Sequence, residues 1–244
     1  PSCDDDDEND LRYVVYEILN RLPFNEVLRP FETELLNLAL EPLPQENERN
    51  ALLCLKIIFD LHRNFRPQME KKALPFLNFV KNVYKDSGKL LEEVVGTRTK
   101  SSKGRGTDDK DLSPCTLPST RSFKVMTECP LIIMLLFQLY SRNIQGDIEE
   151  IVPLMVKMIG MDGGSKGNQE RQETDERYND LKAAQVKTVS FITYLLRGSP
   201  GLVEPHQEAI SSAIVTLLQT CPDVVSTRKE LLVATRHVLG SPAF

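Results

Sequence analysis

Residues 51–61 read ALLCLKIIFDL and carry only two charged side chains, Lys56 and Asp60. Residues 131–137 read LIIMLLF and carry none. A helix that is apolar almost all round has to be covered on several sides by other parts of the protein. Both stretches are far shorter than the roughly 18 residues that a membrane span needs, so no membrane partner is expected. The sequence therefore predicts buried helices that are wedged between neighbouring helices.

Both stretches belong to a series of predicted helix pairs. Apolar residues recur at helical spacing along most of the chain, and the alternation typical of strands is scarce. We expect about nine helices, at residues 9–21, 30–41, 48–65, 69–85, 120–143, 147–160, 175–197, 205–220 and 226–239. After the first helix, a moderately amphipathic helix repeatedly precedes a more apolar one, at about 40–50 residues per pair once two loops are discounted. This period is typical of HEAT and armadillo repeats.

The predicted fold class is all-α, an α-solenoid of HEAT-type helical repeats with about four helix pairs plus one leading helix. Residues 1–244 are expected to form a single solenoid segment of a larger protein, because the start PSCDDDDEND lacks an initiator Met. Both ends should expose apolar surface, since neither has the polar outer face of a capping repeat. Residues 96–119 and 161–174 are rich in Gly, Ser, Thr and charged residues, and they are predicted to be flexible loops.

Local signals place some helix ends and breaks. Asp147-x-x-Glu150 and Thr227-x-x-Glu230 have the spacing of capping boxes, which satisfy backbone N–H groups at a helix start. Pro130 should kink or restart its helix, because proline removes a backbone hydrogen bond and clashes with the preceding turn.

The cysteines bear on the redox state of the protein. They are Cys3, Cys54, Cys115, Cys129 and Cys221. Their number is odd, none stands in a C-x-x-C pair, and three lie in or beside apolar helical stretches. This usage favours reduced, partly buried thiols in a cytosolic or nuclear protein over a disulfide framework.

No metal or catalytic site is predicted. The acidic run Asp4–Asp7 fails the EF-hand pattern, because Asn9 stands where glycine is needed and Val15 where glutamate is needed. It is interpreted as a solvated tail or loop end. The order G-x-S-x-G occurs at 163–167, GGSKG, but in a glycine-rich polar stretch that follows no strand, so no nucleophile is predicted there. The histidines lie on three different predicted helices without metal-ligand spacing, at His62, His206 and His237.

Phosphate and nucleic-acid binding have weak candidates. The glycines of residues 103–106 and 162–167 lack the order of a phosphate-binding loop and follow no strand. The basic residues of TRTKSSKGRG, 97–106, are diluted by Ser, Thr and Gly and are followed by DDKD. A localisation or nucleic-acid role of this stretch, and phosphorylation at Ser113-Pro114, stay open. The net charge of −5 favours neither a DNA nor an RNA surface, so no direct nucleic-acid partner is expected.

Residues 226–240, STRKELLVATRHVLG, gather several charged residues and a histidine on one short predicted helix. At helical spacing, one broad apolar side is predicted to contain Leu231, Leu232, Ala234, Val238 and Leu239. The other side is basic and contains Lys229, Arg236 and His237. Glu230 is expected to cap the helix with Thr227, and Arg228 is expected to reach the preceding turn with Asp223 as its partner charge. A partner-contact role of the basic side is the functional hypothesis, and catalysis there is not expected.

Longer blocks of sequence resemble a known family, the TRRAP (transformation/transcription domain-associated protein) family, in its N-terminal HEAT region. The blocks run in family order over most of residues 10–240, and the two polar loops depart from the family pattern. The blocks are NERNALLCLKIIFDLHRNFRP (47–67), FLNFVKNVYK (76–85), SFKVMTECPLIIMLLFQLYSRNI (122–144), IVPLMVKMI (151–159), LKAAQVKTVSFITYLLR (181–197) and RKELLVATRHVLG (228–240).

The resemblance implies a function that periodicity alone does not. Members of this family are very large nuclear pseudokinases and shared subunits of SAGA-type and NuA4/TIP60-type histone acetyltransferase complexes, where they receive transcription activators at chromatin. The chain is then expected to be a non-catalytic scaffold segment of a transcription coactivator in the nucleus. Its expected partners are other subunits of these complexes, transcription activators and the rest of its own solenoid. The resemblance carries over no catalytic, cofactor-binding or metal residue, and no cofactor is expected.

Two other interpretations of the sequence exist. The alternative is a regulatory HEAT solenoid of a catalytically active phosphatidylinositol-3-kinase-related protein kinase. No H-R-D or D-F-G element occurs in this sequence, so the chain itself is not expected to be an enzyme. A transport-type HEAT protein such as an importin is disfavoured by the family blocks.

Overall fold

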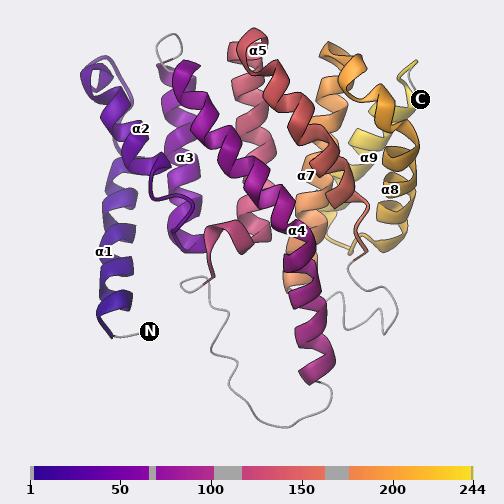
Figure 1. The fold of residues 1–244 in the computed structure, drawn as a ribbon, viewed down its shortest axis with the longest axis horizontal. Helices are drawn as coiled ribbons and strands as arrows, with labels where there is room; N and C mark the ends of the chain where they lie inside the picture. The colour runs from indigo at the N-terminus through magenta and orange to yellow at the C-terminus, as the bar shows by residue number, and fades with distance from the viewer. Residues whose placement is uncertain (1–2, 66–69, 102–116, 163–175, 243) are drawn as a thin grey trace. The chain divides into compact units, whose positions relative to one another are not determined.

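A computed structural model describes residues 3–65, 70–101, 117–162, 176–242 and 244. Within these ranges every long element is a helix, and the only β-type pairing is an isolated bridge between Asn47 and Pro118. The helices are α1 (Cys3–Asn20), α2 (Glu32–Leu40), α3 (Glu48–Asn64), α4 (Ala73–Ser101), α5 (Phe123–Ile159), α7 (Glu176–Gly198), α8 (Gln207–Thr220) and α9 (Val225–Leu239). Short 3-10 turns lie at Arg29–Phe31, Glu70–Lys72, Ser119–Arg121, Pro200–Leu202 and Glu204–His206. The prediction of an all-α, HEAT-type helical-repeat fold is confirmed, and Figure 1 colours the helices by their order along the chain.

The chain divides into two compact units. One contains Pro1–Asn82 with Gly106–Gln145, and the other contains Val83–Arg105 with Gly146–Phe244. Helices α4 and α5 each contribute residues to both units. Each unit is described by itself below.

In the first unit, α1 and α2 both pack on α3 (Figure 1). Helix α3 contains the ALLCLKIIFDL stretch, and its apolar side chains are almost fully buried at Ala51, Cys54, Leu55, Ile57, Ile58 and Leu61. Each such leucine or isoleucine contributes roughly 1.5–3 kcal/mol on burial. The predicted wedging of this apolar helix between neighbours is confirmed.

In the second unit, α7 contacts both α8 and α9. Its side chain Gln185 also holds the end of α5, because Gln185 Nε2 donates to the carbonyls of Met158 at 3.1 Å, Ile159 at 3.3 Å and Met161 at 2.8 Å. The last carbonyls of a helix have no partner within the helix, so a buried helix end needs such donors. A single amide side chain therefore satisfies the buried C-terminus of α5.

Helix α5 replaces two predicted helices, 120–143 and 147–160. Its one residue with non-helical backbone angles is Tyr140, at φ −132° and ψ 26°. The expected break at Pro130 is therefore wrong, and the break lies at Tyr140 instead. The Tyr140 ring packs edge-on against buried His62, with 5.9 Å between ring centroids, so tertiary packing holds the residue where the helix breaks. Asp147 lies inside the helix, and the predicted capping box at Asp147-x-x-Glu150 is wrong.

Two predicted boundaries also move outward. Helix α4 continues to Ser101, so residues 96–101 are helical although they were assigned to the 96–119 loop. The helix penalty of Gly, Thr and Ser is only about 0.5–1 kcal/mol per residue, which neighbouring helix formers can offset. Helix α1 starts at Cys3, so the run Asp4–Asp7 is helical and not a tail. Acidic residues are favourable in the first turn, where the helix dipole is positive. Residues 102–116 and 163–175, most of the two predicted loops, lie outside the described ranges.

The described cysteine side chains are free and buried, at Cys54, Cys129 and Cys221, as predicted. Burial raises the pKa of Cys54 to about 12, with further raising by the charge of Glu46. Helix α5 is long and apolar enough to cross a membrane by length and composition, but 56% of its most apolar window is buried inside the protein. Core helices pass the same test, and α5 is accounted for as one.

Candidate functional site

Exposed apolar stripes lie on α1 and α9. On α1, Leu11, Val14, Val15 and Ile18 are 46–65% exposed and follow the i, i+3, i+4, i+7 spacing of one helix face. On α9, the exposed stripe recurs every seven residues at Val225, Leu232 and Leu239, which are 60–79% exposed. The prediction that both ends of the segment expose apolar surface is confirmed.

The buried face of α9 is narrower than predicted. Only Leu231, Ala234 and Val238 are buried, whereas Leu232 and Leu239 face solvent. Contact with α7 covers one stripe at i, i+3 and i+7, and a residue one position later is turned by about 100° away from it. The broad apolar side predicted for this helix is therefore corrected to a stripe.

Arg228 lies where the sequence predicted it. Its guanidinium donates to the carbonyl oxygens of Pro222 and Cys221, each at 3.2 Å, and Nη1 lies 3.5 Å from Asp223 Oδ1. The head thus reaches the preceding turn, as expected for a long side chain whose stem packs along the helix.

Glu230 is not a capping residue. Helix α9 starts at Val225 after an N-cap, Val224, that makes no side-chain cap bond, so the capping box with Thr227 is wrong. The Glu230 carboxylate reaches α7 instead, at 2.7 Å from Lys187 Nζ and at 2.9 Å from Ser190 Oγ, which donates to it. Glu230 therefore contacts the neighbouring helix α7 and does not make the local capping contact that the spacing predicted.

A basic pocket lies between the ends of α7 and α9. One Arg197 amino group is 2.6 Å from the His237 ring nitrogens, and Arg236 lies beside them in the wall. The pocket has a volume of about 640 Å³ and is further lined by Thr193, Leu196, Gly240, Ser241 and Pro242. In the part of the chain that the structure describes, no carboxylate lies within 4.0 Å of Arg197 or Arg236. Hereafter "the basic pocket" means this site.

The sequence located only half of this pocket. Arg236 and His237 belong to the predicted basic side of α9, and both are exposed. Arg197 was missed, because it comes from α7, and no spacing rule links residues on different helices of a repeat. The helix-pair period places the ends of α7 and α9 at corresponding positions. A comparison of these positions is the signal that could have pointed to Arg197.

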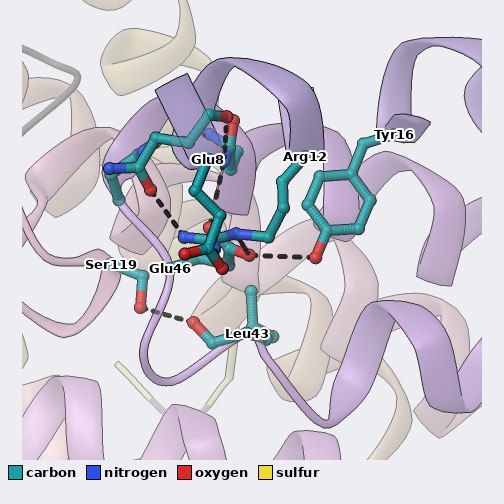
Figure 2. A network of polar contacts seen from close by, with 9 residues as sticks. Glu8, Arg12, Tyr16, Leu43, Glu46 and Ser119 are labelled. Carbon is teal, nitrogen blue, oxygen red and sulfur yellow. Dashed lines mark hydrogen bonds and ion pairs between the residues drawn. The ribbon is translucent and has the colours of Figure 1, made fainter. Parts of the chain in front are cut away.

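A buried polar network joins α1 to the segment before α3 (Figure 2). The carboxylate of Glu46, which is 2% exposed, accepts from the Tyr16 hydroxyl at 2.9 Å and from Asn50 Nδ2 at 3.0 Å. Arg12 Nε lies 3.0 Å from the same carboxylate, and Nη1 binds Glu8 at 2.6 Å. Burial, more than any charge, raises the pKa of the Tyr16 hydroxyl far above its usual range. Both Glu46 oxygens are occupied, so the network has a structural role.

The turn before α5 is held in a similar way. Ser119 Oγ donates to the Leu43 carbonyl at 2.6 Å (Figure 2), and Ser122 Oγ donates to the Glu48 carboxylate at 2.6 Å. Asn47 caps α3 by accepting from the Asn50 backbone N–H at 2.9 Å. These buried hydrogen bonds hold the turn before α5 and the start of α3 in place.

Two buried basic side chains carry perturbed pKa values. His62 is fully buried, its Nδ1 lies 3.4 Å from the Tyr140 hydroxyl, and burial lowers its pKa to about 4. Lys182 is also fully buried, with Nζ 5.2 Å from the Tyr178 ring centroid, and burial lowers its pKa. His62 packs against α5 through Tyr140, and Lys182 packs inside the helical core of its unit.

The remaining candidates divide between described and undescribed residues. Among the described residues, no three His, Cys, Asp or Glu side chains are grouped so that they could hold a metal ion. The stretch at 103–106, the Ser113-Pro114 dipeptide and most of residues 162–167 lie outside the described ranges.

Comparisons with known proteins agree on one family. Residues 177–242, which contain the basic pocket, match the family described as "Tra1 HEAT repeat central region". The sequence blocks resemble the N-terminal HEAT region of the family. The family model that matches residues 177–242 is instead described as the central HEAT region. Related proteins match far more of the chain than this family model does.

The human "Transformation/transcription domain-associated protein" is 35% identical over 94% of this chain, and its counterpart in Danio rerio is 34% identical over 94%. The Saccharomyces cerevisiae "SAGA complex/NuA4 acetyltransferase complex subunit TRA1" is 27% identical over 96%. The chain spans only 6–8% of the length of these relatives. The chain belongs to the TRRAP/Tra1 family of transcription-associated proteins and is a HEAT-repeat segment of that family.

Proposed function

We propose that the chain is a non-catalytic scaffold segment of a transcription coactivator subunit in SAGA/NuA4-type histone acetyltransferase complexes, acting in the nucleus. Its partners are other subunits of these complexes, transcription activators and further repeats of the same kind, and it needs neither a cofactor nor direct contact with nucleic acid or membrane. The name of the Saccharomyces cerevisiae relative supports the assignment to these complexes.

The observation that carries the proposal is the surface that the fold leaves uncovered. The buried side chains of Glu46 and Gln185 bind other parts of the fold. The apolar stripes of α1 and α9 and the basic pocket lie at the surface. A repeat protein with this arrangement acts by presenting surface to partners.

A chimera tests the proposal. In the human relative, the matched region of 251 residues is replaced by this chain, and the tagged protein is purified from nuclei. We expect the chimera to co-purify with acetyltransferase subunits and nucleosome-acetylating activity close to the level of the unaltered protein. A matched control carries a reshuffled sequence of the same composition in the same place. Recovery no better than that control would contradict the scaffold role.

A second experiment tests activator contact separately. The purified chain is immobilised and incubated with acidic activation domains, next to an importin-type HEAT protein of similar length and net charge. Enrichment on the chain alone supports contact with activators in this segment. Equal recovery on both proteins would remove activators from its partners and leave the assembly role in place.

A further inference from the structure

The basic pocket concentrates positive charge without a counter-ion. Arg197 and Arg236 both line it, neither has a described carboxylate within 4.0 Å, and Arg197 rests on the His237 ring at 2.6 Å. An imidazole that accepts from a guanidinium is neutral on that nitrogen, so the pair adds no negative charge. The pocket therefore has two permanent positive charges.

A purely structural role for these cations is poorly supported. Basic residues in the last turn of a helix often donate to the final carbonyl oxygens and offset the helix dipole. Arg228 shows what this looks like in the same unit, since it donates to the carbonyls of Pro222 and Cys221. Among the described contacts, Arg197 and Arg236 donate to no carbonyl, and the Arg197 head turns to His237. The two guanidinium groups are thus available to a ligand.

The composition of the pocket favours a phosphoryl group over a carboxylate. A phosphorylated side chain carries a charge of about −1.5 to −2 and three acceptor oxygens, whereas a carboxylate has one charge and two oxygens in a plane. Two guanidinium forks match the phosphoryl group in charge and in number of donors. Thr193 and Ser241 also line the pocket, and the Thr193 hydroxyl donates to the Ser190 carbonyl at 2.7 Å.

The surroundings of the pocket indicate what lies beside the phosphoryl group. Leu232 stands one turn before Arg236 on α9, and Leu239 stands one turn after it, so the three share a face. Both leucines are exposed. Apolar side chains next to the phosphorylated residue of a partner would cover Leu232 and Leu239.

We propose that the basic pocket binds a phosphorylated serine or threonine, flanked by apolar residues, on a partner protein. This rests on the proposed function, because it assigns the chemistry of one partner to a segment that acts by presenting surface. Arg197 and Arg236 hold the phosphoryl oxygens, and His237 positions Arg197 through their 2.6 Å contact.

Binding of a labelled peptide to the full chain tests the proposal. The probe is a glycine-capped peptide with one phosphoserine between two leucines, compared with the same peptide carrying serine or glutamate at that position. We expect the phosphopeptide to bind at least about tenfold more tightly than either. Arg197→Gln and Arg236→Gln should each weaken phosphopeptide binding by about tenfold or more. Arg21→Gln, which removes the same charge from an exposed side chain of the turn after α1, should change it less than about twofold.

The outcomes separate clearly once circular dichroism has verified that each variant has the helix content of the unaltered chain. Equal binding of the serine peptide, or no effect of Arg197→Gln and Arg236→Gln, overturns the phosphoryl pocket. Equal binding of the glutamate peptide also overturns it and makes an acidic segment the ligand. The scaffold role is tested separately by the chimera. If the chimera with both substitutions still co-purifies with acetyltransferase subunits while the peptide experiment fails, only the pocket proposal is wrong.

Discussion

Glu46 is almost fully buried, yet it is tied to three side chains from α1 and α3, Arg12, Tyr16 and Asn50. Burying a carboxylate is expensive unless opposite charge and hydrogen-bond donors surround it. Because these partners come from two helices, the carboxylate fixes α1 against α3 as well as satisfying its own charge.

Replacing Glu46 tests this role. Glu46→Ala leaves the Tyr16 hydroxyl and Asn50 amide without their acceptor and Arg12 without its buried charge partner. We expect a loss of about 2–3 kcal/mol in the free energy of unfolding, measured by urea denaturation. Glu17→Ala is the matched control, since Glu17 pairs with Arg21 at 2.8 Å on the exposed side of the same helix. That pair should contribute less than about 1 kcal/mol, and equal losses for both variants would contradict the buried network.

His62 should make stability depend on pH. Burial lowers its pKa in the folded protein to about 4, whereas the ordinary value is about 6.5. The unfolded chain then binds more protons between these values, so the stabilising effect is full above about pH 6.5 and is lost as the pH falls towards 4. We expect His62 to account for a loss of about 2 kcal/mol between about pH 7.5 and 5.

Two variants check the histidine prediction by urea denaturation at both pH values. His62→Gln cannot titrate in this range, so the fall in unfolding free energy should shrink by that amount. Tyr140→Phe keeps His62 buried and should retain the full fall, because burial and not the hydroxyl lowers the pKa. An unchanged pH dependence in His62→Gln would refute the assignment.

Single side chains were predictable from the sequence only where local geometry decided their position. Arg228 reached the preceding turn as expected, because its targets lie six and seven residues away. Glu230 and Arg197 were not predictable in this way, since their partners lie on another helix forty residues distant. A capping contact and a contact with another helix use the same side chain, and Glu230 makes the contact with the other helix.

Helix α9 illustrates how one element divides its two roles. Leu231 is 1% exposed and packs inwards, whereas its neighbour Leu232 is 60% exposed. Leu231 therefore packs in the core, and Leu232 forms part of the exposed surface.

The two leucines give a direct comparison. Leu231→Ala should lower the free energy of unfolding by about 3 kcal/mol, because it opens a cavity at a packed site. Leu232→Ala should change it by less than about 0.5 kcal/mol, because solvent already surrounds that side chain. Thermal or urea unfolding of both variants is the measurement. Similar losses would mean that the face of α9 assigned as exposed is packed.

Helices as units were largely predictable, and their ends were less so. Apolar spacing located each of them because burial enforces the helical period over many residues. The break at Tyr140 escaped prediction, since it depends on a ring contact with His62 and not on a local breaker. Pro130, the expected breaker, lies inside the continuous run of α5.

For the chain as a whole, the alternation of amphipathic and apolar helices carried the prediction of a HEAT-type repeat. Among the described contacts, α3 packs against α1 and α2, and α7 packs against α8 and α9. The basic pocket could be predicted only in part, because a repeat period places helices but does not specify which side chains of two helices meet.

Hydrogen–deuterium exchange tests the central claim most directly, by comparing the free chain with the same chain inside the chimeric human protein assembled in its complex. A scaffold segment should keep α3 and α7 as its slowest-exchanging helices in both states, because the repeat core does not change. Helices α1 and α9, whose apolar stripes are exposed in the free chain, should gain protection on assembly. Equal exchange of α1 and α9 in both states would contradict the account.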